Sequence, residues 1–565
     1  MFTDVKTCRR GPLGNERGTA LVLSLFLITV LTVLGTMVLN TSIVEIKMAQ
    51  NQKISSQVFY AAEAGLERGL LMLINDFQTE GGSAWANNSF PGWAETVSVA
   101  DGTGSTTFDA DVRSLDMYLG SSDSRLKKLT LGGGHTVNNL TFDLYLFRQD
   151  NDEVYVMSHG YGNGGTAAIE YHLKMDDLSP YNNAIFTGAG VSGHFQGSTN
   201  VAGSIYSRGT LTMGANIKIT NNYSTGHHPL APGDDLYDML PSVTDLETKV
   251  RVKGGDLTVE ANSAQIGYAG SNNEVEGIYV DGMTNVSNTN DASVGTHYYN
   301  NNLSNEVPDV PLPSIYDGLK EVFDDNGLDL DTCIASKSGG NDAAIATSIY
   351  ADWVQGTGCA SSLPSSGVVI DAATAFGNKI DQGDGPYTYD DGAGNGFFFD
   401  GNTLTIKGNV VILGDLDFGQ ANGNDTITYE VYGDSSGGFD QADGGTLYVS
   451  GNLGIRGDFS PDPAKGYLKG VTGADDINSL GVVTPNDITF SGKPGNIHAG
   501  FYFAEGQINF NKQSKFAGTV IGGLVNFAQV PDIYQVPNLK NYLPKGVPGG
   551  QNIIKLTRRE WRRVY

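Results

Sequence analysis

The pattern of hydrophobic and polar positions changes twice along this chain. Near the start, the 26 residues from Thr19 to Val44 contain no charged side chain and are rich in Leu, Val and Ile. Apolar residues then recur every three or four positions as far as Phe77, which predicts an amphipathic helix that ends at Gly81-Gly82. From Ala184 onward, short apolar runs broken by Gly and Asn predict many short strands.

The first change predicts one helix with two different halves. An uncharged run of 26 residues exceeds the ~20 that cross a bilayer. A helix over residues 19–77 would have 59 residues and a length of ~88 Å. Its first half suits lipid, and its second half suits packing on a globular domain. Four cations precede the run (Lys6, Arg9, Arg10 and Arg17). They predict a single-pass protein with its N-terminus in the cytoplasm and the rest exported.

The residues around this helix carry a family resemblance. The segments RGTALVLSL (17–25), VEIKMAQNQ (44–52) and QVFYAAEAGLERG (57–69) resemble the PilX-type minor pilins of type IV pili, and residues 155–175 are similar to their Gly-interrupted β-hairpin. The resemblance implies that prepilin peptidase cuts between Gly18 and Thr19, leaving a methylated Thr19. It also implies an inner-membrane precursor that joins the major pilin and other minor pilins in a pilus on the cell surface. An ordinary single-span anchor is the alternative.

One position departs from the usual pilin pattern. Most pilins carry Glu at the fifth residue after the cut, where it neutralises the N-terminal amine of the subunit ahead, but this chain has Leu23. A buried charge without a partner is costly, so a subunit with none ahead of it gains nothing from that Glu. Leu23 therefore favours a tip or priming position, where a pilus tip adhesin is an expected partner. Ordinary sequence variation within the family is the alternative explanation for Leu23.

The region after residue 184 is predicted to be mainly β. Strands of four to seven residues recur with turn signals about every 8–12 residues, which fits a sandwich, a barrel or a parallel β-helix. Frequent Gly-Asn and Gly-Asp corners, without Asn-Gly hairpins, favour an imperfect right-handed parallel β-helix. An enlarged pilin sheet is the alternative. The fold class is therefore α+β: a long pilin helix with a small pilin-type sheet, followed by a mainly β domain.

These patterns divide the chain into seven parts. They are a leader (1–18), a pilin helix (19–80, with 19–44 in the membrane or filament core), a pilin-like globular part (81–180), two β-solenoid parts (184–304 and 366–550), an irregular insertion between them (305–365) and a basic tail (551–565).

Charge restricts the partners. Acidic residues outnumber basic ones 62 to 35, and the net charge is −27. The main body therefore repels phosphate backbones, so nucleic acid is not an expected partner there. The tail at 551–565 carries five cations and one anion. Docking of the tail on an acidic surface of the chain or a neighbour is the simpler interpretation, and DNA contact is the alternative.

Cysteine usage agrees with export. Once the leader with Cys8 is removed, Cys333 and Cys359 remain. An even pair in an oxidising compartment predicts a disulfide, with two free buried thiols as the alternative.

Candidate chemistry is sparse. Asp324, Asn326, Asp329 and Asp331 supply oxygen ligands that suit Ca²⁺, but the spacing departs from an EF-hand loop, and an acidic surface loop is the alternative. No other cofactor is expected. His227-His228 is predicted to lie in a solvated loop, since adjacent His residues rarely face one metal.

No zinc-protease motif or P-loop is present in the sequence. The sequence therefore favours a non-enzymatic minor pilin that promotes pilus assembly and displays a β domain for adhesion or partner docking at the filament tip. A surface-anchored, carbohydrate-active β-helix enzyme exported with a pilin leader is the alternative.

Overall fold

The structure is a computed structural model. It describes residues 16–79, 126–129, 135–137, 140–148, 153–267 (except 194, 196, 241–242, 244 and 262), 275–286, 307–432 (except 338–339), 444–462, 480–537, 543–549 and 554–564. The chain forms two compact units. The first comprises residues 1–176 and 556–565, and the second comprises residues 177–555.

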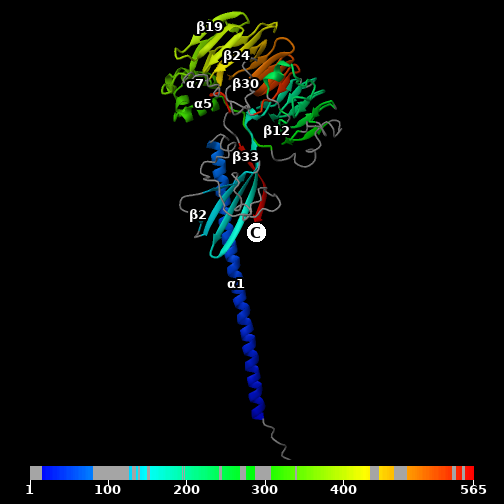
Figure 1. The fold of residues 1–565 in the computed structure, drawn as a ribbon, viewed down its shortest axis with the longest axis vertical. Helices are drawn as coiled ribbons and strands as arrows, with labels where there is room; N and C mark the ends of the chain where they lie inside the picture. The colour runs from blue at the N-terminus through cyan, green and yellow to red at the C-terminus, as the bar shows by residue number, and fades with distance from the viewer. Residues whose placement is uncertain are drawn as a thin grey trace, which may run out of the picture. The chain divides into compact units, whose positions relative to one another are not determined.

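The first unit begins with one continuous helix, α1 (Glu16–Thr79), drawn in blue in Figure 1. Its apolar part is long and uncharged enough to cross a membrane by length and composition. Side chains there are exposed, and hydroxyls bond back to the helix, as Thr32 does to the Ile28 carbonyl (2.7 Å). The predicted helix is therefore present, and its first half offers an uncharged surface with few unpaired polar groups.

The second half of α1 packs on a sheet. Val58, Ala62 and Leu66 are fully buried, which matches the predicted apolar stripe. The approach is close: a Cβ added to Gly160 would lie 2.4 Å from the Val58 carbonyl oxygen. Gly160 therefore allows the helix backbone to contact the sheet directly.

The sheet of the first unit has the strand order β1-β3-β4-β5-β33, with β2 also paired to β3. Its strands are β1 (Leu126–Leu129), β2 (His135–Val137), β3 (Leu140–Arg148), β4 (Glu153–Gly162), β5 (Gly165–Asp177) and β33 (Ile554–Val564). The pairs β3–β4 and β4–β5 are antiparallel. Most of the segment predicted as a basic tail is thus strand β33, beside β5. The second unit is therefore inserted between two neighbouring strands of the first.

The second unit is built mainly of parallel strand ladders. The first ladder contains β17 (Gly367–Asp371), β22 (Asn409–Leu413), β25 (Gly445–Val449), β28 (Leu480–Thr484), β30 (Asn496–Phe510), β31 (Ser514–Phe527), β6 (Ile185–Thr187), β9 (Ile205–Arg208), β12 (Lys249–Lys253) and β15 (Gly277–Val280). Each strand pairs in parallel with the next in that list.

Two further ladders share the long strands β30 and β31. One adds β18 (Lys379–Ile380), β23 (Leu416–Phe418), β26 (Leu453–Ile455), β29 (Ile488–Phe490) and β7 (Val191–Gly193). The other adds β21 (Thr403–Lys407), β24 (Thr426–Tyr432), β27 (Asp458–Pro461), β32 (Asp532–Tyr534), β8 (Asn200–Ala202), β11 (Lys218–Thr220) and β14 (Gln265–Ile266). A separate parallel sheet holds β10 (Leu211–Met213), β13 (Leu257–Val259) and β16 (Thr284–Val286).

The stacking order differs from the chain order. Strand β31, near the end of the unit, pairs with β6, near its beginning. Residues 185–286 therefore continue the stack that residues 367–534 build, and the chain enters and leaves the unit near the middle of the stack. This topology could not be deduced from the spacing of strands in the sequence.

The Gly-Asn and Gly-Asp corners have a direct structural role. Asp415 Oδ1 accepts a hydrogen bond from the Asn452 amide (2.7 Å), Asn452 Oδ1 accepts one from Asp487 (3.3 Å), and Asp487 Oδ1 accepts one from Gln507 (2.7 Å). Each corner side chain thus accepts a bond from the backbone of the next layer, which explains why Asn and Asp recur at the turns.

The interior of the stack is apolar and contains a column of phenylalanine rings. Phe490, Phe510, Phe527 and Phe195 follow one another with ring centroids 4.9–5.4 Å apart, a geometry that favours aromatic packing. The antiparallel strands β19 (Asp384–Asp390) and β20 (Gly396–Gly401) and the helix α8 (Ala372–Phe376) place Tyr387 and Phe376 against this core.

The segment 305–365 was predicted to be an irregular insertion, but much of it is helical. It holds α5 (Ile315–Asp325), α6 (Leu330–Ser336) and α7 (Asp342–Gln355). Ser314 and Asp317 form a capping box on α5, and Tyr350 of α7 stacks on Tyr448 of the ladder at 4.2 Å. A disulfide joins Cys333 to Cys359, with Cα atoms 5.4 Å apart.

The pairing of β5 with β33 generates a testable prediction. Deleting residues 554–565 should lower the thermal stability of the first unit, because β5 loses the backbone hydrogen bonds on one edge. Limited proteolysis with mass spectrometry should then show faster cleavage within residues 165–177. Deleting only Tyr565, which lies beyond β33, is the control. Equal cleavage rates in the two truncations would contradict the prediction.

Candidate functional site

The predicted processing site lies at the start of α1. Gly18 and Thr19 belong to the first turns of the helix, which begins at Glu16. Thr19 is exposed, and the side chain of Leu23 is 70% exposed. The structure thus places this junction next to the apolar surface, and the cleavage itself remains a prediction.

The acidic residues predicted as a calcium site form helix ends instead of one cluster. Asp324 pairs with Lys320 within α5 (3.2 Å), and the Asn326 amide donates to the Val322 carbonyl (2.8 Å). Asp329 caps α6 by accepting from the amide of Asp331 (3.1 Å). In the part of the chain that the structure describes, no group of three or more His, Cys, Asp or Glu side chains is placed to hold a metal ion.

The structure points to a different site, which the sequence did not predict. The loop at 221–234, expected to be solvated, lies against the first residues of β31 and β32. Three hydrogen bonds fix it: Tyr223 Oη donates to the Gln535 carbonyl (2.5 Å), the Leu230 amide donates to the Tyr223 carbonyl (2.8 Å), and Tyr534 Oη donates to the His228 carbonyl (2.8 Å). The loop is therefore held near its start and in its middle.

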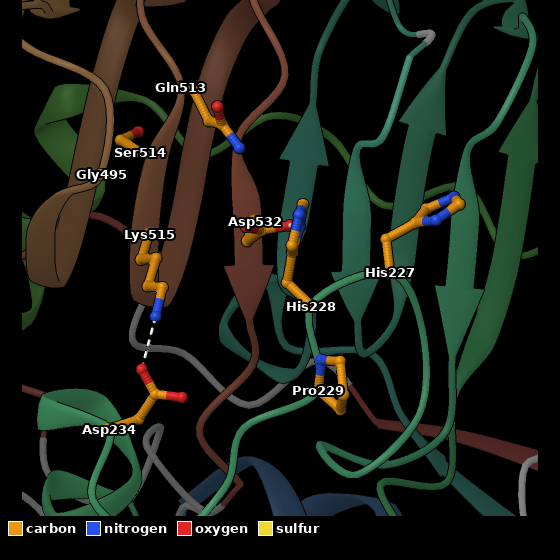
Figure 2. Close-up of a pocket in the computed structure, with 9 residues that line it drawn as sticks. All are labelled: His227, His228, Pro229, Asp234, Gly495, Gln513, Ser514, Lys515 and Asp532. Atoms are coloured by element: carbon orange, nitrogen blue, oxygen red, sulfur yellow. Dashed lines mark hydrogen bonds and ion pairs between the residues drawn. The ribbon is translucent and has the colours of Figure 1, made fainter.

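A histidine–carboxylate hydrogen bond and a salt bridge connect the loop to the strands. His228 Nδ1 lies 2.9 Å from Asp532 Oδ1, and Lys515 Nζ lies 2.6 Å from Asp234 Oδ1. A dashed line in Figure 2 marks the contact between Lys515 and Asp234. The side chain of Asp532 is only 3% exposed. Burial raises the pKa of Asp532 to about 6, although the bond from His228 and the charge of Lys515 both act to lower it.

These groups surround a cavity of about 340 Å³. Seven of the nine residues that line it have polar side chains: the lining consists of His227, His228, Pro229, Asp234, Gly495, Gln513, Ser514, Lys515 and Asp532. Ser514 Oγ and His227 Nε2 are buried and have no hydrogen-bond partner. Burial, together with the charge of Lys218, lowers the pKa of His227. The cavity thus offers buried polar atoms that are still able to pair.

The parallel ladder brings distant residues to this cavity. Lys515, Asp532 and Asn200 occupy successive positions across β31, β32 and β8. Asn200 is fully buried, and neither its amide oxygen nor its nitrogen has a partner. Gly226 of the loop packs on it: an added Cβ would lie 2.0 Å from Asn200 Oδ1. The loop therefore follows the ladder closely at this point.

Sequence reasoning missed this site because the paired residues are far apart in the chain. His228 and Asp532 are separated by 304 residues, and Asp234 and Lys515 by 281. The adjacent histidines were the one usable signal, and without the stacking order nothing indicated that a carboxylate lies beside them.

A second histidine is buried near the cavity. His498 on β30 is fully buried, neither of its ring nitrogens has a partner, and its ring lies 4.8 Å from that of Phe490. Burial lowers its pKa to about 4. His498 therefore belongs to the apolar core in its neutral form, and the cavity does not include it.

Comparisons with known proteins support the pilin resemblance at the N-terminus. Residues 17–67 match the PilX N-terminal family, which confirms the predicted resemblance over that segment and supports a type IV pilin role. No curated protein matches the chain. Among solved structures, the chain is similar to the competence-associated pilin ComZ from Thermus thermophilus, with 18% sequence identity and a TM-score of 0.47. The match covers 90% of this chain and 98% of that one.

The buried His498 makes the stability of the fold sensitive to acid. Its folded-state pKa of about 4 lies below the ordinary value of 6.5, so the unfolded state binds the proton more readily. The free energy of unfolding therefore keeps its full value above about pH 6.5. It decreases by about 3 kcal/mol as the pH falls towards 4, because the unfolded state takes up the proton and the folded state does not.

The variant His498→Phe tests this directly, because Phe cannot titrate. We expect the variant to gain up to about 3 kcal/mol of unfolding free energy relative to the wild type between pH 7 and pH 4. Denaturant unfolding at the two pH values measures this difference. A difference that is the same at both pH values would show that His498 does not titrate on unfolding.

Proposed function

We propose that this protein is a minor pilin of a type IV pilus, incorporated at or near the filament tip, where it promotes assembly and displays its second unit for adhesion or partner binding. The observation that carries the proposal is the matched segment, residues 17–67, on a continuous helix with an uncharged, exposed first half. A surface of this kind suits both the bilayer and a bundle of identical helices. Its expected partners are the major pilin, other minor pilins and a tip adhesin.

The second unit supports the tip assignment by its size. It comprises residues 177–555, and a head this large on every subunit would crowd a closely stacked shaft. The parallel ladders fit the proposed β-helix, and the general preference for right-handed crossovers favours a right-handed one. Leu23 adds support, since it leaves no carboxylate for a subunit ahead.

The processing step can be tested at Gly18. Prepilin peptidase should cut between Gly18 and Thr19, so Gly18→Phe should accumulate as a full-length precursor in the inner membrane. Gly35→Phe is a matched control, because an added Cβ at Gly35 meets no atom within 4 Å. Immunoblotting of membrane fractions distinguishes the two lengths. Mature protein from Gly18→Phe in normal amount would contradict the prepilin assignment.

The tip assignment predicts one subunit per filament. An epitope tag added after Tyr565 should be found by immunogold electron microscopy at filament ends, whereas the same tag on the major pilin should mark the whole length. Deleting the gene should reduce pilus number or adhesion and leave the helical form of the shaft unchanged. Regular labelling of the shaft by the tagged subunit would refute the tip position.

A further inference from the structure

We propose that the cavity between the loop at 221–234 and strands β31 and β32 binds a single uncharged sugar residue. This inference rests on the proposed function, because it assigns a ligand class to the unit that the pilin would display. It is carried by the lining of the cavity, its charge balance, its unpaired polar atoms and its size.

The lining matches a ligand rich in hydroxyl groups. Asp532 supplies acceptor oxygens and Lys515 supplies donors, while Gln513 and Ser514 can each donate and accept. A hydroxyl group also donates and accepts, so a ring with several hydroxyls can pair with all of these groups. Pro229 and the carbon atoms of the polar side chains supply the apolar part of the lining.

The charge balance favours an uncharged ligand. Asp532 already faces His228, and Lys515 already faces Asp234. A charged ligand would have to compete with these contacts, and separating Lys515 from Asp234 would leave a partly buried charge without its partner, which is costly. The net charge of −27 on the whole chain further disfavours anions.

Unpaired buried atoms indicate a site built for a ligand. Ser514 is 2% exposed, it lines the cavity, and its hydroxyl has no hydrogen-bond partner. A buried polar atom left unpaired is costly and uncommon. A ligand hydroxyl in the cavity would pair with Ser514 and remove that cost.

The size of the cavity limits the ligand to about one ring. At about 340 Å³ it lies at the lower end of the ~300–1,000 Å³ typical of small-molecule sites. The loop is already fixed by its hydrogen bonds, so little ordering has to accompany binding. A terminal sugar residue of a surface glycan would therefore fit better than an internal stretch of polysaccharide.

Saturation-transfer NMR on the mature full-length protein in detergent tests the inference. The probes are the methyl glycosides of glucose, galactose, mannose and N-acetylglucosamine. We expect at least one to bind, and its affinity to fall at least tenfold in Lys515→Met. Lys512→Met is the matched control, since Lys512 is exposed and lies outside the lining; it should bind like the wild type.

Ser514→Ala separates a binding role from a structural one. Removing an unpaired buried hydroxyl should leave the unfolding temperature of the free protein unchanged or raise it, while it weakens sugar binding. Gly226→Ala should abolish binding, because its side chain would strike Asn200, whereas Gly233→Ala has the same backbone strain but open space around its Cβ. Gly233→Ala should therefore retain more binding.

The outcomes separate this inference from the proposed function. Failure of all four glycosides to bind, or binding that Lys515→Met and Ser514→Ala leave unchanged, would overturn the sugar site even if tagged subunits mark filament ends. Binding that these variants weaken, in a protein found along the shaft, would keep the sugar site and refute the tip position.

Discussion

Backbone pairing along β31 is the interaction on which the second unit depends. This strand pairs in parallel with β30 on one side and with β6, β7 and β32 on the other. It therefore joins the part of the chain that enters the unit first to the part that leaves it last. Without this pairing, the two halves of the stack would each present an open edge, and unpaired backbone groups at such an edge are costly to bury and prone to wrong pairing.

The same pairing creates the cavity. Because β8 and β32 stack in register, Asn200 and Asp532 become neighbours, and the loop that follows β11 reaches across them. A buried carboxylate and a buried unpaired amide are both expensive for a fold. Much of the interior of the ladder is apolar, with rings such as Phe490 and Phe510 in contact. Part of the cost of burying polar groups therefore lies where the two halves of the chain meet.

The sequence predicted the fold unevenly, and the reasons are physical. The helix α1 was predictable because its pattern is local: an uncharged run followed by a three-to-four-residue repeat. The parallel layers were predictable from their corners, since Asp415 and Asn452 recur where each layer must bond to the next. The helix α7 was not predicted, although Tyr350 and Trp353 have helical spacing. The many polar residues around it in the sequence suggested an irregular insertion instead.

The site was less predictable than the fold because it depends on the order of stacking. A motif can be read from a sequence when its residues are close in the chain or follow a fixed spacing. His228 and Asp532 meet only because residues 185–286 stack beyond β31 instead of before β17. Strand periodicity is the same in both arrangements, so no periodic signal distinguishes them. What does distinguish them is connectivity: β5 and β33 are neighbours in the first unit. The inserted chain must therefore leave and return at one place, and a stack entered at its middle meets that requirement.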